Sequence, residues 1–437
     1  MKKLKLLSVL LFLGLSGSAF AQDAGSSSIE KADYGFIFIA AVLIFLMQAG
    51  FCLLEMGFSR SKNAINIVMK NMCDLGAGAL GYFLVGFSLM FGWTQGGFVG
   101  LGNFGFNSEF GGEHPIWIFF LFQVMFAAAA ATISSGAMAE RTYFPGYLVY
   151  AAIACTFIYP LLGHWAWGSG GGDFGFGGTE GWLETLKFKD FAGSTVVHGI
   201  GGAFALAGII VIGPRKGRFL EDGSARIFPG HNMPLAALGF FLLFFGWFGF
   251  NGGTNLTADA AVGAICTNTL LAGAAGLVGA MIIHWIVKGW ADAEIAMNGG
   301  LGGLVSITAC CNCVAPWAAI IIGIVAGLII VFGEGILRSF RIDDAVGAVP
   351  VHLFCGFWGT LCVSIFNTST PFETLHIQAL GGLVIPISAF ALSFVVFKII
   401  NATVGLRAPE EAQDQGLDFA EHSATAYPDF TINSDED

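Results

Sequence analysis

The chain has 437 residues, of which 55% are hydrophobic and only 11% charged, with 63 glycines and 44 phenylalanines. This composition excludes a soluble globular domain and is typical of an all-α polytopic protein embedded in a lipid bilayer. The net charge is −11 and no basic patch stands out, so we expect no nucleic-acid partner.

The N-terminal region has the pattern of a secretory signal peptide. Lysines at the start of the chain precede the apolar run Leu6–Leu15, and Ala19–Ala21 is a small-x-small cleavage motif. We therefore predict a signal peptide over residues 1–21 and a short periplasmic segment over residues 22–32.

A transmembrane domain is expected over residues 33–405, because apolar segments of membrane-spanning length follow one another there. Glycine and alanine recur through these segments, which favours helices that pack closely in lipid. Eleven such segments are predicted, at residues 34–58, 64–92, 115–139, 142–166, 190–213, 233–253, 257–288, 294–313, 315–338, 344–367 and 375–404.

Charges in the loops predict how the helices are oriented. The loops after the first, third, fifth, seventh and ninth segments carry most of the lysines and arginines, whereas the loops on the other side of the membrane carry only Lys187 and Lys189. The more basic loops are therefore expected in the cytoplasm. The chain would then be an inner-membrane protein with its N-terminus outside and its C-terminus inside. The basic loops carry Arg60, Lys62, Arg141, Arg215, Lys216, Arg218, Arg226, Lys288, Arg338 and Arg341.

Two histidines lie in matching apolar sequences. Asp190–His198 and Asp344–His352 both place a glycine five residues before the histidine and a valine directly before it. One interpretation is that both histidines are core residues, each with its ring hydrogen-bonded to a neighbour. The matched pair favours a functional centre, since ionisable residues inside a membrane are costly.

The same repeat predicts how the domain is organised. Five segments per half is an odd number, so the halves, about 33–213 and 233–367, would have opposite orientations. Such an inverted repeat brings equivalent residues together near the middle of the bilayer. Helix 375–404 lies outside the repeat.

An acidic residue begins each histidine segment. Asp190 and Asp344 are suited to cap a helix, because a carboxylate accepts hydrogen bonds from free backbone N–H groups. A second interpretation is that Asp190 also orders the outer mouth and lowers its potential for cations.

Aromatic residues form a second group near the outer side. Phe122 and Phe126 share one helical face, Trp167 closes a segment, and Phe250 shares a face with Thr254. Aromatic faces with a hydroxyl can hold a small cation. An interfacial aromatic belt is the alternative interpretation.

Several ordered motifs make the chain resemble an ammonium transporter of the Amt/Mep/Rh family. The resemblance covers all eleven segments and the tail, and implies a homotrimer with one pore per subunit. The motifs are Ser59–Asn63 (SRSKN), Gly136–Arg141 (GAMAER), Asp190–His198 (DFAGSTVVH), Trp247–Asn251 (WFGFN), Asp343–Gly356 and Thr403–Pro409 (TVGLRAP).

The resemblance also implies roles for single residues. Thr254 stands where the bacterial pattern often has serine, and Gly347 stands where many members have an acidic residue. The implied roles are ammonium recruitment by Phe126, Trp167, Phe250 and Thr254, a gate of stacked Phe126 and Phe250, pore twin histidines His198 and His352, and a structural acid at Asp190.

The implied function is an ammonium transporter or channel. Ammonium would be recruited at the outer aromatic cage and deprotonated, and ammonia would pass the histidine pair, whose imidazoles can relay a proton. Residues 406–437 would form a cytoplasmic regulatory tail, of which Gly405–Tyr427 docks on the cytoplasmic face and couples the pores while Pro428–Asp437 stays loose. A P-II-type signal protein is the regulator that the family implies.

Rival functions remain open at this point. They are an ammonium sensor of the same fold and a channel for another small neutral solute such as urea or carbon dioxide. No enzyme is expected, because the chain lacks a glycine-rich nucleotide loop and a catalytic triad pattern. Cys310, Cys311 and Cys313 suit packing better than a disulfide or a metal site, so we expect no metal and no cofactor.

Overall fold

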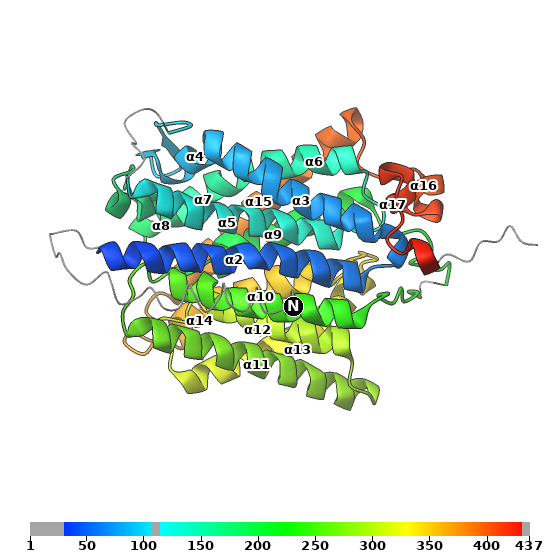
Figure 1. Cartoon of the computed structure of the whole chain (residues 1–437). Coiled ribbons are helices and arrows are strands. Elements are labelled where there is room, and N and C mark those ends of the chain that lie inside the picture. The colour runs from blue at the N-terminus through cyan, green and yellow to red at the C-terminus, as the bar shows by residue number, and fades with distance from the viewer. Residues whose placement is uncertain (1–29, 107–113, 223, 431–437) are drawn as a thin grey trace, which may run out of the picture.

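The computed structural model describes residues 30–106, 114–222 and 224–430. The predicted signal peptide, residues 1–21, lies outside this range, as does most of the predicted periplasmic segment. Within it, long helices run side by side in one bundle (Figure 1). The chain is thus an all-α membrane protein, as the composition predicts.

The first half of the bundle contains three π-helical segments, η2, η3 and η5, and a small antiparallel hairpin. Its elements are α2 (Lys31–Phe58), η1 (Ser61–Asn63), α3 (Ala64–Gly81), η2 (Tyr82–Gly86), α4 (Phe87–Phe91), β1 (Trp93–Gln95), β2 (Val99–Leu101), α5 (Ile116–Ala137), α6 (Phe144–Ile153), η3 (Ala154–Ile158), α7 (Tyr159–Trp167), η4 (Gly168–Phe174), α8 (Trp182–Thr185), η5 (Ser194–Gly199) and α9 (Ile200–Ile212).

The second half continues the bundle and ends in a short helical tail. Its elements are α10 (Met233–Trp247), η6 (Phe248–Gly252), α11 (Ala261–Lys288), α12 (Ala293–Thr308), α13 (Pro316–Ser339), η7 (Val349–Phe354), α14 (Cys355–Ile365), α15 (Leu375–Thr403), α16 (Glu410–Gln415), α17 (Leu417–His422) and η8 (Pro428–Phe430).

Each of the predicted apolar segments contains a helix. Among the described residues, nine helical stretches are long and apolar enough to cross a membrane, and Val349–Ile365 is a shorter apolar helix. The count of eleven spans therefore stays a prediction. The helices in segments 190–213 and 344–367 begin later than predicted, at Ser194 and Val349, because each is preceded by a loop that its aspartate organises.

Glycine permits the closest helix contacts, as expected for packing in lipid. A Cβ atom on Gly57 of α2 would lie only 2.5 Å from the backbone nitrogen of Ala236 in α10. A Cβ atom on Gly276 of α11 would lie 2.2 Å from the carbonyl oxygen of Gly299 in α12. A larger residue at either position would push the two helices apart.

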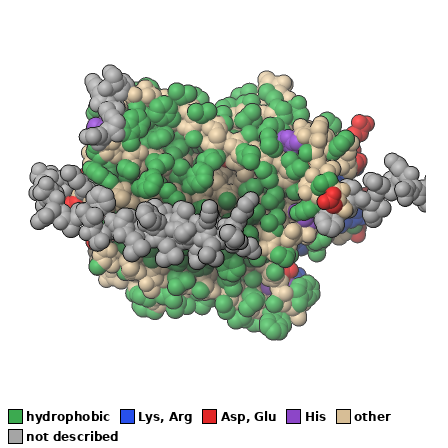
Figure 2. All heavy atoms as spheres, viewed as in Figure 1, with side chains coloured by type: hydrophobic (Ala, Val, Ile, Leu, Met, Phe, Trp, Pro, Cys, Tyr) green, Lys and Arg blue, Asp and Glu red, His purple; other side chains and the backbone are tan. Residues whose placement is uncertain are grey.

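The flank of the bundle is apolar. Figure 2 shows hydrophobic side chains over most of this surface, while the acidic and basic groups in view gather mainly at the end where α16 and α17 lie. Large side chains such as Leu80, Phe241 and Ile387 are 66%, 65% and 62% exposed. An apolar surface of this extent is suited to contact with lipid.

The C-terminal tail packs against the end of the bundle that carries the basic loops. Leu406 and Leu417 are fully buried there. The Arg407 guanidinium donates to the carbonyl oxygens of Ile212 and Pro214 at 2.9 and 2.8 Å. These contacts hold the tail against this end of the bundle, while its predicted cytoplasmic position and regulatory role stay predictions.

Further polar contacts hold the tail farther along its length. The Asp418 carboxylate accepts a hydrogen bond from the backbone N–H of Asn66 at 2.8 Å. His231 and the Tyr427 hydroxyl lie 3.0 Å apart. The prediction that Pro428–Asp437 is loose concerns residues that lie mostly outside the described part of the chain.

Candidate functional site

The loop before η5 is ordered by the Asp190 carboxylate. Its two oxygens accept hydrogen bonds from the backbone N–H groups of Gly193, Thr195 and Val196 at 2.8 to 3.0 Å. Gly193 has φ +114°, which a residue with a side chain rarely adopts. The carboxylate thus satisfies the free amides where the helix that carries His198 begins.

The loop before η7 repeats this arrangement. Asp344 accepts from the backbone N–H groups of Val346, Gly347 and Val349 at 2.7 to 3.3 Å. Gly347 has φ +78°. A residue with a side chain would therefore be strained at this position, and the glycine suits its backbone.

Three π-helical segments carry the predicted pore residues. His198 lies in η5, Phe250 in η6 and His352 in η7. A π-turn widens the helix by one residue and changes the direction of the side chains that follow it. This local distortion turns the three rings towards a common axis.

The two histidines are in direct contact. The Nδ1 atoms of His198 and His352 are 3.1 Å apart, and the ring centroids are 5.2 Å apart with an interplanar angle of 23°. One Nδ1 must donate and the other accept, which sets opposite tautomers on the two rings. The matched sequence repeat thus brings together residues that are 154 positions apart.

Aromatic rings extend this pair into a column. Phe250 lies 5.5 Å from His198, and Phe126 lies 4.3 Å from Phe250, between ring centroids. Trp167 meets Phe126 edge-on at 6.1 Å. Phe126 and Phe250 are almost completely buried, so the two rings close the column above the histidines.

A cavity of about 220 Å³ lies at the end of this column that is farther from the histidines. Phe126, Trp167 and Thr254 line it, together with Gln123 and Glu184. Phe250 lies beneath Phe126. Three of the four predicted recruitment residues therefore share one cavity, and the fourth contacts it through Phe126.

Hydrogen bonds fix the orientation of two cavity residues. The Trp167 indole nitrogen donates to the Asp190 carbonyl oxygen at 2.7 Å, so the loop that carries the acid also holds the tryptophan. The Thr254 hydroxyl donates to the Phe250 carbonyl oxygen at 2.8 Å. That leaves the hydroxyl lone pairs as acceptors towards the cavity.

Sequence reasoning missed Trp247 as a neighbour of the pair. Its indole stacks on His198 at 5.1 Å with an interplanar angle of 17° and is fully buried. The motif WFGFN contained this residue, but its place beside the histidine depends on the turn at η6.

A buried set of charged residues was also missed. Glu55, Lys70 and Asp74 are at most 2% exposed, although they lie inside predicted membrane segments. The Glu55 carboxylate accepts from the side chains of Asn71 and Ser135 at 3.0 and 2.9 Å. Charged residues within apolar segments were the signal that could have revealed this set.

The end of the bundle with the basic loops holds a network of ion pairs. The Asp343 carboxylate binds Arg215 through Nε and Nη2, both at 2.9 Å, and Glu140 contacts Arg60 and Arg215. Although burial opposes it, the hydrogen bonds and charges of Arg215 and Arg141 hold the pKa of Asp343 well below its usual range.

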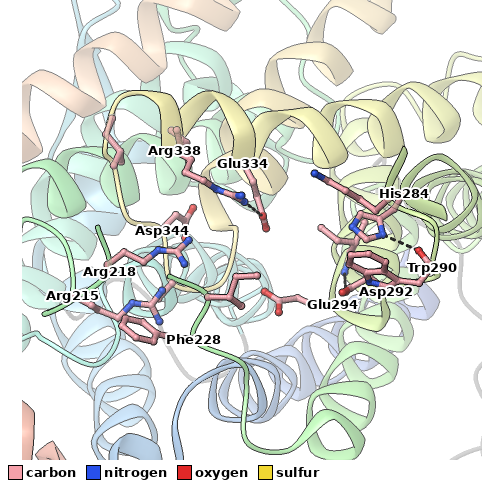
Figure 3. Close-up of a pocket in the computed structure, with 16 residues that line it drawn as sticks. Arg215, Arg218, Phe228, His284, Trp290, Asp292, Glu294, Glu334, Arg338 and Asp344 are labelled. Carbon is pink, nitrogen blue, oxygen red and sulfur yellow. Dashed lines mark hydrogen bonds and ion pairs between the residues drawn. The ribbon is translucent and has the colours of Figure 1, made fainter. Parts of the chain in front are cut away.

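Beside this network lies a charged pocket of about 260 Å³ (Figure 3). Arg215 and Arg218 face Glu294 across it, and Arg338 pairs with Glu334 at 3.5 Å on α13. Asp344, which caps η7, also lines this pocket. The pocket thus adjoins the start of η7, the segment that carries His352.

The cysteines do not form a bridge or a ligand cluster. Cys310, Cys311 and Cys313 are free thiols, and the first two are fully buried among apolar side chains. In the described part of the chain, no three histidine, cysteine or acidic side chains gather in a way that suits a metal ion.

The whole chain matches known proteins. The model of the Ammonium Transporter Family matches residues 35–427. The chain belongs to the ammonium transporter family. It is 41% identical to the ammonium transporter Amt2 of Archaeoglobus fulgidus over 98% of this chain and 96% of that protein. It is 42% identical to a putative ammonium transporter of Synechocystis, over 95% and 93%.

Solved structures of the family share the fold. A structure described as a "Sensor Amt Protein" is similar with a TM-score of 0.85 and 41% identity, over 89% of this chain and 98% of that one. Candida albicans Mep2 is similar with a TM-score of 0.79 and 27% identity, over 88% and 87%. The family and the fold predicted from the sequence motifs are both confirmed.

Proposed function

We propose that this family member transports ammonium by recruiting the ion at the outer aromatic cavity and conducting ammonia past the histidine pair. The observation that carries the proposal is the column of rings from Trp167 through Phe126 and Phe250 to His198 and His352. It joins a cation-binding surface to a pair of proton-transferring groups along one line.

Recruitment follows from the chemistry of the outer cavity. The faces of Trp167 and Phe126 attract a small cation through their ring quadrupoles, by about 0.5–2 kcal/mol per contact. The hydroxyl oxygen of Thr254 can accept one N–H of the ion. Glu184 on the cavity wall and the Asp190 loop behind Trp167 add negative charge.

Deprotonation follows from the cost of the next step. Moving an intact ammonium ion between Phe126 and Phe250 would strip its hydration, which costs many kcal/mol for a charge and far less for neutral ammonia. His198 lies directly below Phe250 and can accept the proton at Nε2, which has no hydrogen-bond partner there. Ammonia can then pass the rings as a neutral solute.

The same arrangement explains selectivity against potassium. A potassium ion can bind aromatic faces, but it has no proton to give up and would have to cross the rings as a charge. Discrimination therefore comes from acid–base chemistry and does not need a filter of fixed size.

Purified protein in proteoliposomes tests this function. Inward ammonium gradients should raise the internal ammonium content in a saturable way, while equal potassium gradients should produce no flux. Liposomes with His198→Ala protein are the matched control. Equal fluxes of ammonium and potassium through the wild-type protein would contradict the proposal.

A sensor is the second candidate, and the 41% identity with the "Sensor Amt Protein" favours considering it. A sensor would bind ammonium in the outer cavity and change a contact with a partner without net flux. Saturable binding by the wild-type protein with no uptake in the same liposomes would favour this alternative.

The remaining family features are part of the same proposal. We propose a homotrimer in the inner membrane, with the N-terminus outside after signal cleavage and the docked tail in the cytoplasm. The tail would couple the pores, and a P-II-type protein would bind at the charged end of the bundle. Size measurement in detergent and a pull-down with such a protein test these points.

A further inference from the structure

Below the histidine pair lies a second cavity that the aromatic column does not include. Its volume is about 20 Å³, which is enough for about one water molecule. The lining includes His352, Glu55 and Asn298 together with apolar side chains such as Phe51 and Val346. Three polar side chains around a space of this size satisfy the usual needs of a single buried water.

His352 has one ring nitrogen available to bind a water in this cavity. His352 uses Nδ1 for the contact with His198, so Nε2 is its remaining polar atom. Phe51 packs beside the same ring at 6.1 Å between centroids. The ring is 5% exposed, whereas His198 is fully buried, so the inner histidine is the one that water can reach.

The Glu55 side chain is held in place within the helix bundle. Asn71 and Ser135 both donate to its Oε2 atom, and Lys70 donates to the Ser135 carbonyl oxygen at 2.7 Å. A Cβ atom on Gly136 would lie 3.0 Å from the Glu55 carboxyl carbon and 2.8 Å from Val346 Cγ2. The absence of a side chain at Gly136 therefore lets the carboxylate reach the wall of the cavity.

We infer that Glu55 receives the transported proton from His352 through one water in this cavity. The inference rests on the proton relay in the proposed function and names the residue where that relay ends inside the protein. Glu55 lies one turn before the end of α2, which is the end of the bundle that carries the basic loops.

The proton transfers balance along this path. Ammonium gives a proton to His198 Nε2, and the proton on His198 Nδ1 passes to His352 Nδ1. The proton on His352 Nε2 passes to the water, which gives one of its own to the Glu55 carboxylate. Ammonia and a neutral Glu55 result, and the carboxyl group then releases the proton to water at the inner end.

Other ionisable groups surround Glu55 and set its charge balance. Lys70 on α3 is the buried positive charge that acts on Glu55. Asp74, also on α3, accepts a hydrogen bond from the Tyr147 hydroxyl and does not line the cavity. The groups that act on Glu55 or contact its cavity are Cys52 on its own helix, Lys70 and Asp74 on α3, Tyr147 on α6 and His352 on η7.

The test separates charge movement from ammonia movement in proteoliposomes. In Glu55→Gln, the amide oxygen can still accept from Asn71 and Ser135, but the side chain takes up no proton. We expect ammonium-driven current to fall at least about tenfold, while ammonia permeation measured by internal pH stays within about twofold of wild type. Glu55→Asp should restore part of the current.

A matched control is Asp74→Asn, which removes a carboxylate from the same buried set without reaching the cavity. It should keep the wild-type ratio of current to ammonia flux. Wild-type current in Glu55→Gln would overturn the inference while leaving the proposed function in place. A wild-type protein with ammonia flux but no current would overturn the relay itself, and the inference with it.

An infrared measurement on the wild-type protein tests the inference without depending on whether a variant folds. Proton arrival at a buried carboxylate gives a carboxylic acid C=O band in the infrared difference spectrum when ammonium is added to the wild-type protein. Absence of such a band would also overturn the inference. Where Glu55→Gln folds, the band should vanish from that variant and persist in Asp74→Asn.

Discussion

The two histidine segments share one backbone design but have different surroundings. In both, an aspartate caps the loop, a glycine with positive φ follows, and a π-turn directs the imidazole inward. His198 is enclosed by Trp247 and Phe250, whereas His352 faces a small cavity that Glu55 and Asn298 line together with apolar side chains. The repeat therefore supplies a matched pair of rings, and their neighbours give the two rings different surroundings.

The inner segment also has an anchor that the outer one lacks. Asp343 directly precedes the capping Asp344 and is paired with Arg215 through two side-chain hydrogen bonds. The residue that precedes Asp190 is Lys189, whose backbone N–H and carbonyl bond the Gln378 side chain instead. The ion pair of Asp343 with Arg215 thus stabilises the His352 segment, and the side-chain amide of Gln378 stabilises the His198 segment.

The largest expected effect comes from breaking this ion pair. Asp343→Asn removes the carboxylate that binds the buried Arg215 through two hydrogen bonds, leaves only the longer contact with Glu140, and should destabilise the protein by about 3 kcal/mol. Thermal unfolding in detergent measures this loss. Asp222→Asn, an exposed acid in the loop after Arg215, is the matched control and should change stability little.

The same pair predicts a dependence on pH. Since the pKa of Asp343 is held below its usual range, its contribution is present above about pH 4 and is lost as pH falls through the folded-state value. The wild-type unfolding temperature should therefore drop as acid is added. A similar acid-induced drop in Asp343→Asn would show that other carboxylates are responsible.

Replacing each histidine separately tests whether the two rings have different tasks. His198→Ala should reduce methylammonium uptake by about 100-fold, because the proposed proton acceptor beside Phe250 is lost. His352→Ala should cost less, about tenfold, because water from the inner cavity can occupy its place. Uptake by a transport-deficient strain, with protein amounts matched, measures both effects. Equal losses would argue against distinct tasks.

The capping aspartates allow a comparison at the level of stability. Asp190→Asn should cost about 2 kcal/mol and Asp344→Asn about 1 kcal/mol, since Asp190 is the more deeply buried of the two. Thermal unfolding measures the difference, and the exposed Asp173→Asn on the outer side is the control. A larger cost for Asp344→Asn would reverse this ranking.

The smallest expected effect concerns the outer cavity. Trp167→Leu should raise the concentration for half-maximal transport about fivefold, which corresponds to about 1 kcal/mol of lost cation–π attraction. Trp317→Leu is the control, because that indole is 61% exposed on the flank of the bundle. If both variants behaved alike, Trp167 would be part of an interfacial belt.

Much of this arrangement could be predicted from sequence, because it depends on local pattern. Apolar length located the helices, and the repeated Asp-x7-His motif was sufficient to predict that His198 meets His352. The π-turns could not be predicted, since they depend on how η5, η6 and η7 pack against one another. The cavity between Glu55 and His352 joins residues almost 300 positions apart, and no local pattern links them.

The ring pair of Phe126 and Phe250 has a consequence for the rate of transport. The centroids are 4.3 Å apart and both side chains are buried, so on the proposed path ammonia would pass only after a ring rotates aside. Rotation of a single ring leaves the helices in place, unlike the collective rocking motions that take about microseconds to milliseconds. The barrier to transport would then move while the scaffold stays still, and covalent cross-links between neighbouring helices should leave turnover unchanged.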